Sequence, residues 1–191
     1  MASLILHQII GEKYCNINNI DNPQKFLKGN IAPDIAPDKD AGHYKDPRPI
    51  FTYYDAAKDR VNLHTFCKSN KIDNDYNLGY FLHLVTDHIF YNILIADNPQ
   101  FIEFCTKPYK QSSAQMYTEY DRVANYLLQL FPQTDLTILP KAAINTLNEK
   151  LQILDENKLI EFISICSNIN LQQLYTEVIN QDSSTLLKIK F

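Results

Sequence analysis

The stretch NDYNLGYFLHLVTDHIFYNILIAD, residues 74–97, predicts the centre of the fold. Its apolar side chains recur around nearly the whole circumference of a helix, which is typical of a helix buried on most sides. The same stretch nevertheless carries His83, Asp87 and His88. Burying an ionised carboxylate is costly unless it is paired or binds a metal ion. The polar residues therefore need an explanation beyond packing.

His83 and Asp87 are four residues apart, so both project from one face of the expected helix. An imidazole nitrogen and a carboxylate oxygen placed in this way can bind the same metal ion at about 2.0–2.2 Å. A buried His–Asp hydrogen bond, or an Asp that reaches solvent, explains the pattern equally well. His88 points about 100° away from Asp87, and we expect it outside the reach of such an ion.

Gly79 lies one turn before His83 on the same face. Glycine in a helix interior costs about 1 kcal/mol relative to alanine, which suggests that another segment or a ligand comes close there. The alternative is that residue 79 is near a frayed helix end.

Helical spacing of apolar residues extends over most of the chain outside residues 29–55, and glycine is rare, with four residues. We therefore expect an all-α, multi-helix bundle, and the 191 residues fit a single domain, 1–191. The expected helices cover residues 3–14, with Ser3 as N-cap, 23–29, 59–68, 74–97, 112–131, with a Ser N-cap, 141–154, 156–167 and 170–181.

The segment GNIAPDIAPDKDAGHY, residues 29–44, interrupts this pattern. Its two prolines predict a long irregular loop after the first helices. It carries Asp34, Asp38, Asp40 and His43. Long loops in compact domains are usually functional or disordered, so this one is either a solvated acidic loop or half of a metal site.

The first expected helix repeats the anomaly of the central one. His7 is flanked by Leu6 and Ile9 in the apolar run SLILHQII. A lone histidine in such a helix is either a hydrogen-bonded core residue or a ligand. His64 has no acidic partner at helical spacing, and we expect it to be structural.

Composition excludes several classes of protein. The net charge is −4 and no basic stripe is present, which argues against binding to duplex nucleic acid. Four widely spaced cysteines without a CxxC pair are expected to be buried free thiols. No apolar run reaches the ~20 residues of a membrane span and no export signal is recognisable, so we expect a soluble, cytoplasmic protein.

Several motifs, taken in order, resemble one known family. These are His7, NPQKFLKGNIAPDI at 22–35, HY at 43–44 and LGYFLHLVTD at 78–87. Together they resemble the zinc-dependent phospholipase C family, including the small bacterial zinc-phospholipase-like hydrolases. The resemblance covers about the first 90 residues. It implies a helical domain of the phospholipase C and nuclease type, which holds up to three zinc ions and cleaves phosphodiester bonds.

The resemblance also implies roles for individual residues. His7 matches the early histidine ligand, and Asp34 matches the acid of the PD motif, a candidate ligand and general base. His43 matches the histidine after that segment. His83 and Asp87 match the HxxxD ligand pair, whose aspartate can bridge two ions. Imidazoles and carboxylates are the natural ligands of catalytic zinc.

The chain also departs from the family pattern. Secreted members use a free terminal amino group and a further histidine beyond the HxxxD pair; here only the adjacent His88 follows. The later HxxxE pair has its nearest match in Tyr117 and Asp121. These three residues are weaker site candidates. We therefore expect one or two ions, zinc or another divalent metal, rather than three.

The function predicted from these features is metal-dependent hydrolysis of phosphoric esters, similar to that of phospholipase C, with Asp34 orienting or deprotonating the attacking water. The substrate is a phospholipid or a small soluble phosphodiester, which the sequence does not separate. The alternative is a helical protein that binds metal or is purely structural and has lost turnover, as the missing later ligands suggest. A nuclease is a third and weaker interpretation.

Overall fold

The computed structural model of the chain describes residues 3–47, 61–94, 106–141, 144–181 and 184–189. Within these ranges the backbone forms helices and irregular connections, and no β-strand is present. The only extended pairing among them is an isolated bridge between Lys45 and Val61. The predicted all-α class is therefore confirmed.

Most helices begin where an Asn or Asp side chain accepts a hydrogen bond from the backbone three residues later, which is the usual N-cap interaction. The capping residues are Asn22, Asp38, Asn62, Asn74, Asp155 and Asn170. The helices are α1 (Leu4–Ile17), α2 (Pro23–Ile35), α3 (Lys39–Gly42), α5 (Leu63–Ser69), α6 (Asp75–Ile89), the π-helix η1 (Phe90–Leu94), α8 (Tyr109–Leu130), α9 (Glu156–Asn168), α10 (Leu171–Ile179) and α11 (Ser184–Leu187).

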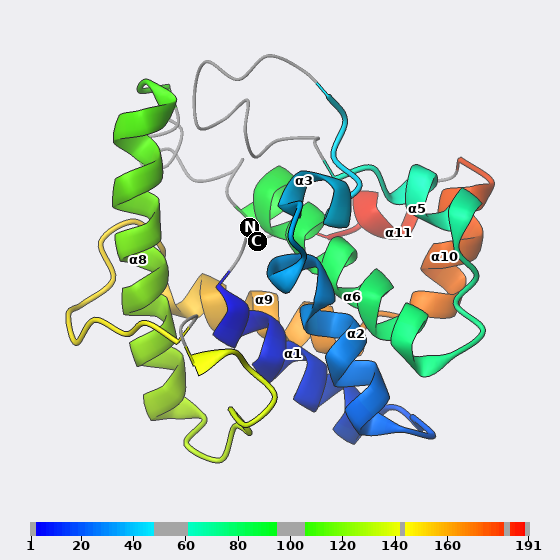
Figure 1. Ribbon diagram of the computed structural model, residues 1–191, viewed down its shortest axis with the longest axis horizontal. Coiled ribbons are helices and arrows are strands. Elements are labelled where there is room, and N and C mark those ends of the chain that lie inside the picture. The colour runs from blue at the N-terminus through cyan, green and yellow to red at the C-terminus, as the bar shows by residue number, and fades with distance from the viewer. Residues whose placement is uncertain (1–2, 48–60, 95–105, 142–143, 182–183, 190–191) are drawn as a thin grey trace.

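Helix α6 runs through the middle of the molecule and packs against α1, α2, α5, α9 and α10, while α8 stands at one side (Figure 1). The run from Phe81 to Asp87 is completely buried. The prediction of a central helix is therefore confirmed, with one difference. The α-helix ends at Ile89, and residues 90–94 form the π-helix η1. The last predicted residues, 95–97, lie outside the described part of the chain.

Two glycines allow α2 to cross α6 at very short range. A Cβ atom on Gly79 would collide with the backbone carbonyl of Phe26, and one on Gly29 would collide with that of Tyr76. The predicted close approach at Gly79 is therefore confirmed, and the approaching segment is α2. Because glycine lacks Cβ, the two backbones come into direct contact.

The prediction of a long loop over residues 29–44 is wrong. Helix α2 continues to Ile35 and includes Pro33, and a single turn, α3, follows. Proline removes one backbone donor and disturbs the carbonyl four residues earlier. Pro33 lies in the last turn of α2, where only one hydrogen bond is lost. Pro37 follows the C-cap Ala36, the usual place for a proline after a helix.

The prediction of a helix over 141–154 is also wrong, because the described residues 144–154 are irregular. The reason is a tertiary contact with α8. The buried carboxylate of Glu119 accepts hydrogen bonds from the backbone N–H groups of Gln152, Ile153 and Leu154 at 2.8–3.2 Å. These groups would otherwise belong to a helical ladder. A buried carboxylate needs such donors, so the segment is held in an irregular conformation.

The other helix boundaries differ less from the predicted ones. Helix α1 extends to Ile17 instead of residue 14, and α5 begins at Leu63 instead of 59, with residues 59 and 60 outside the described part. Helix α8 begins after Pro108 rather than at a serine cap, because the Ser112 hydroxyl donates back to the carbonyls of Lys107 and Pro108. The helices predicted over 156–167 and 170–181 are confirmed as α9 and α10.

Two of the four cysteines, Cys67 and Cys166, are buried and free, as predicted, and Cys15 is half-buried. Burial raises the pKa of the Cys67 thiol to about 12, which keeps it protonated and unreactive. Cys105 lies outside the described residues.

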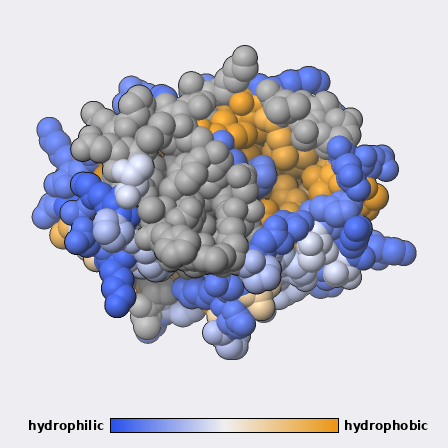
Figure 2. Space-filling view, turned by 90° about the horizontal axis from the view of Figure 1, so that it is seen from above, coloured by the Kyte–Doolittle hydropathy of each residue, from blue (hydrophilic) through white to orange (hydrophobic). Residues whose placement is uncertain are grey.

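The surface seen from above is hydrophilic over most of its rim, and apolar residues gather in one recessed area beside the residues drawn in grey (Figure 2). Among the described helices, none is both long and apolar enough to cross a membrane.

We expect the Gly79→Ala variant to lose about 3 kcal/mol of unfolding free energy, because the added methyl meets a backbone carbonyl that no side-chain rotation can move. Denaturant unfolding monitored by circular dichroism measures this loss. Gln24→Ala, at an exposed position of α2, is the matched control and should change stability by less than about 0.5 kcal/mol. Equal stability of Gly79→Ala and the parent would contradict the close crossing.

Glu119→Ala should cost about 3 kcal/mol or more, because it leaves buried N–H donors without an acceptor and removes one of the two carboxylates that pair with Arg122. The same substitution should speed hydrogen exchange at the amides of 152–154, measured by NMR or mass spectrometry. Glu161→Ala, at an exposed position of α9, is the control. Unchanged exchange at these amides in Glu119→Ala would show that another group holds the segment.

Candidate metal centre

Four segments of the chain bring all five of the main predicted site residues into one cluster. His7 comes from α1, Asp34 from the last turn of α2, and His43 from the residue that ends α3. His83 and Asp87 come from the middle of α6. The side chains of the three histidines and Asp87 are almost completely buried, and that of Asp34 is 7% exposed.

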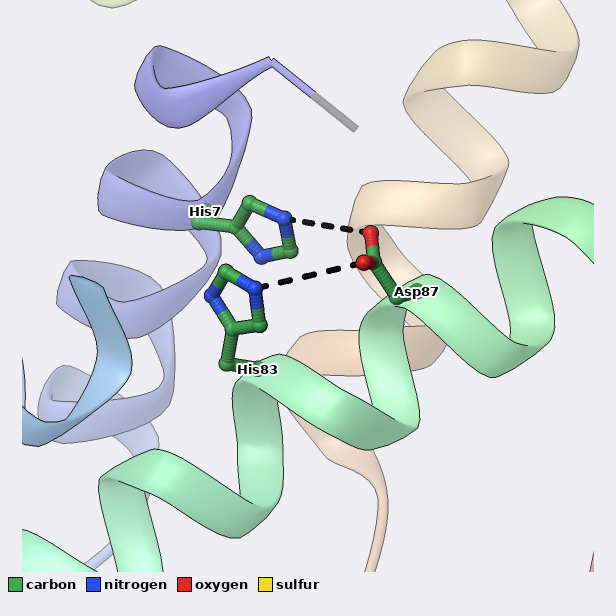
Figure 3. A group of neighbouring side chains, drawn as sticks. All are labelled: His7, His83 and Asp87. Atoms are coloured by element: carbon green, nitrogen blue, oxygen red, sulfur yellow. Dashed lines mark ion pairs between the residues drawn. The ribbon is translucent and has the colours of Figure 1, made fainter. Parts of the chain in front are cut away.

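His7 and His83 lie with their rings stacked, 3.7 Å apart between centroids and inclined by 13°. Asp87 faces the edges of both rings (Figure 3). Its Oδ1 lies 3.4 Å from Nε2 of His7, and its Oδ2 lies 4.0 Å from Nε2 of His83. The prediction that His83 and Asp87 share one helix face is therefore confirmed, and His7 approaches that face from α1.

His43 joins the cluster from the end of α3. Its Nε2 lies 3.5 Å from Oδ1 of Asp34 and 3.5 Å from Oδ2 of Asp87. It also lies 3.1 Å from Nε2 of His83. The segment that the sequence suggested as half of a metal site thus supplies two side chains to the cluster.

The backbone partners of two histidines fix where their protons are. Nδ1 of His83 lies 2.7 Å from the carbonyl oxygen of Asn30, and Nδ1 of His43 lies 2.6 Å from that of Lys39. Because a carbonyl oxygen only accepts, both Nδ1 atoms carry the proton. When both rings are neutral, each Nε2 atom therefore carries a lone pair and no proton, and the two Nε2 atoms lie 3.1 Å apart. A cation bound by both atoms, or a proton on one of them, would remove the repulsion between the lone pairs.

The charge states of the cluster suit metal binding. Burial by itself raises the pKa of Asp34, but His43 and the other imidazoles lower it to about 2. Burial lowers the pKa of His83 to about 3. Burial opposes ionisation of Asp87 as well, yet nearby positive charge and the rings beside it hold its pKa well below the usual range. At neutral pH these groups are two carboxylates and a neutral imidazole, which are the ligand forms that metal ions need.

The spacing of the donor atoms also fits a metal ion. Ligands that share one ion at about 2.0–2.2 Å lie about 3.0–3.5 Å apart when they are adjacent, and most of the distances above fall in or near this range. Two sets of three donors each lie within 4.8 Å, namely His7, His83 and Asp87, and Asp34, His43 and His83. The geometry thus offers two overlapping groups of three donors, which share His83. Only the Nε2 atom of His83 has an available lone pair, so His83 can bind one of two ions but not both.

Asn30 positions two of the histidines, although nothing in the sequence pointed to it. Its carbonyl orients His83, and its Nδ2 donates to the backbone carbonyl of His7 at 2.6 Å. Gly11 leaves the space that this amide occupies. A role that depends on a backbone carbonyl has no signature in residue type, which is why sequence reasoning missed it.

The turn after α3 positions His43. The next residue, Tyr44, has φ of 51°, in the left-handed region that non-glycine residues rarely adopt. Its ring packs edge-on against Phe66, and its hydroxyl accepts a hydrogen bond from Asn70. The Tyr80 hydroxyl donates to the carbonyl of Gly42. These contacts hold the strained turn.

The weaker candidates lie outside both donor sets. His88 is within reach of the Asn92 side chain at 3.2 Å, Tyr117 is exposed, and Asp121 accepts a backbone hydrogen bond from Leu147 through its carbonyl. Neither His88 nor Asp121 belongs to a possible group of His, Cys, Asp and Glu ligands in the described part of the chain.

The remaining polar residues singled out in the sequence have structural positions. Asp38 caps α3, and Asp40 is exposed and pairs with Lys45 at 3.2 Å, so both are on the surface as expected. His64 lies 3.0 Å from the carbonyl of Val178 through Nδ1, which ties α5 to α10.

Comparison of the chain with protein-family models, with curated proteins and with solved structures found no match. The chemistry of the cluster is therefore inferred from its own geometry.

Zinc added to the metal-free protein should raise its melting temperature by about 10 °C. Binding to the folded state alone stabilises it by about 4 kcal/mol at a thousandfold excess over Kd, and 1 kcal/mol corresponds to about 2–4 °C for a domain of this size. Differential scanning fluorimetry with and without a chelator measures the shift. It should disappear in Asp87→Asn and persist in the control His88→Ala. A parent protein that melts at the same temperature with and without zinc would contradict a metal site.

Proposed function

We propose that the protein is a metal-dependent hydrolase of phosphoric esters, similar to the zinc-dependent phospholipase C-like proteins that its first half resembles. The observation that carries the proposal is the pair of Nε2 lone pairs of His43 and His83, which face each other within a ring of two carboxylates and a third imidazole. His7, His43, His83 and Asp87 would hold zinc. When bound, zinc lowers the pKa of a coordinated water to about 7 and polarises a phosphoryl oxygen.

Asp34 has the properties of a general base that accepts a proton from the attacking water. Its pKa of about 2 keeps it a carboxylate at neutral pH, so it can accept a hydrogen bond or a proton from water. Its side chain is the only one of the cluster for which the exposed fraction exceeds 1%. A base must reach the reacting water, and Asp34 is the most solvent-exposed side chain of the cluster.

The substrate class within phosphoric esters follows from the resemblance only. A phospholipid and a small soluble phosphodiester both fit the proposed chemistry. A bacterial source, a cytoplasmic location and a fold of the phospholipase C type belong to the same proposal.

A second candidate function is metal binding without turnover. The complete burial of His7, His43 and His83 favours it, because structural zinc sites are closed whereas catalytic sites keep an open position. A protein of this kind would gain thermal stability from zinc but hydrolyse no phosphodiester at any metal concentration.

The parent protein, purified without an affinity tag, should contain a divalent metal by inductively coupled plasma mass spectrometry. It should also hydrolyse bis-p-nitrophenyl phosphate with added zinc or manganese and lose this activity with a chelator. His83→Ala should lose the metal and at least about a thousandfold in kcat/KM, as removal of a metal ligand implies. His88→Ala, the matched control, should retain both. Metal-free parent protein would overturn the proposal.

The Asp34→Asn variant tests the role of Asp34 as a general base separately from metal binding. We expect it to keep most of the metal and to lower kcat by about 10²- to 10⁴-fold, the usual contribution of a general base. Metal content and steady-state kinetics measured on the same preparation test this. An Asp34→Asn variant with unchanged kcat would remove Asp34 from the proton transfer.

A further inference from the structure

The five donors of the cluster are closed off from solvent. The side chains of His7, His43, His83 and Asp87 are almost completely buried, and that of Asp34 is 7% exposed. A site that acts on a substrate needs an open position. Part of the chain therefore has to move before an ion or an ester from solvent can reach these donors.

His43 is attached to the least buried element that contributes to the cluster. It follows the four-residue turn α3, in which residues 39–41 are exposed and none is buried. His7 and His83 lie inside the long helices α1 and α6, among buried residues. Segments with few buried residues open at a lower free energy than the core of a helix. His43 is therefore the histidine that the protein withdraws from the cluster most easily.

The segment that carries His43 has a hinge at each end. Ala36 and Pro37 lie between α2 and α3, outside both helices. At the other end, the φ of Tyr44 is 51°, a strained value for a non-glycine residue. A return of Tyr44 to negative φ would release this strain and favour opening. We call the segment between the hinges, residues 38–43, the α3 flap.

The α3 flap is held closed by a contact from the central helix. Besides the packing of the flap against α2, the hydroxyl of Tyr80 on α6 donates a hydrogen bond to the carbonyl of Gly42. The Tyr80 ring is itself fixed, because it stacks on Phe66 with 5.4 Å between centroids and an inclination of 17°. Nδ1 of His43 is bonded to the carbonyl of Lys39 within the flap. The imidazole would therefore move with the flap as one unit.

Withdrawal of His43 would uncover the rest of the cluster. Its Nε2 lies within 3.1–3.5 Å of donor atoms of Asp34, Asp87 and His83. Asp34, the most exposed side chain of the cluster, is thus a direct neighbour of His43. The stacked rings of His7 and His83 belong to other helices, so they would stay in place when the flap opens.

We propose that the α3 flap is a gate, which swings on its two hinges, withdraws His43 and opens the buried centre to ions and phosphoric esters. The Tyr80 hydroxyl is its latch, and the closed form predominates, so the donors are in place whenever the flap is shut. This inference rests on the proposed function, because the ion and the ester are those of that function. A gate of this kind reconciles a buried cluster with turnover, as lids do in other enzymes.

Carbethoxylation of histidines by diethyl pyrocarbonate, located by peptide mass spectrometry, tests the gate on the full chain in the presence of a chelator. We expect His43 to react faster than His7 and His83. Tyr80→Phe removes only the latch hydroxyl and should speed the reaction of His43 about three- to tenfold, as the loss of one hydrogen bond implies. Tyr76→Phe, an exposed tyrosine one turn earlier on α6, is the matched control and should react as the parent does.

Zinc exchange distinguishes a latch from a residue that only positions His43. A latch controls opening in both directions, so Tyr80→Phe should raise the rates of zinc uptake and zinc release by the same factor, about three- to tenfold, and leave Kd unchanged. Stopped-flow mixing with a chromogenic chelator measures both rates. Faster release with unchanged uptake, and hence a weaker Kd, would show a positioning residue and overturn the latch.

His43 that reacts no faster than His7 and His83, or a Tyr80→Phe variant in which His43 reacts at the parent rate, would overturn the gate. Preferential reaction of His43 in a parent protein that binds no zinc and hydrolyses no ester would uphold the opening of the α3 flap and overturn the proposed function. Zinc-dependent hydrolysis without preferential reaction of His43 would do the reverse. The two failures are therefore distinguishable.

Discussion

The direct contact of α2 with α6 at Gly29 and Gly79 is the constraint on which the rest of the structure depends. Because the two backbones touch, the carbonyl of Asn30 reaches His83, one turn beyond Gly79. The following turn of α2 then brings Asp34 to the cluster around Asp87. Larger residues at the crossing would separate the helices and, with them, the donors of the site. Packing and chemistry therefore depend on the same two residues.

The cluster itself works against folding unless a cation occupies it. Buried carboxylates and facing imidazole lone pairs carry a desolvation cost that hydrogen bonds only partly offset. A divalent ion bound here would supply the missing positive charge, and we then expect metal binding and folding to be coupled. The rigid surroundings of His43, with Tyr44 in the left-handed region and Tyr80 bonded to Gly42, are consistent with a site whose geometry is set before the ion arrives.

Much of this arrangement could be predicted from the sequence. The buried central helix was predicted from its apolar residues, which cover nearly the whole circumference, and the close crossing was predicted from Gly79. The five residues that the structure gathers into one cluster were predicted as a site partly from residue types and helical spacing and partly from the resemblance of their motifs, in order, to a known family. Periodicity and residue chemistry are local properties, and both are legible without tertiary structure.

The errors have tertiary causes. Pro33 suggested a loop because proline destabilises a helix interior. It lies in the last turn of α2, where the cost is small, and the sequence alone does not show where the helix ends. Residues 144–154 have helical periodicity, but their backbone donors are taken by Glu119 on α8. Likewise, the role of Asn30 depends on its backbone carbonyl, which reaches His83 on another helix. Single-sequence patterns do not encode contacts between distant segments.

X-ray absorption spectroscopy at the zinc edge tests the central claim most directly, because it reports the ligands of the ion in the intact protein. The geometry predicts a first shell of nitrogen and oxygen at about 2.0–2.2 Å, with outer-shell scattering from two or three imidazoles and no sulfur. The signal of at least one imidazole should be lost in His43→Ala. A spectrum with sulfur ligands, or one with no imidazole scattering, would show that the cluster of His7, His43 and His83 is not the metal centre.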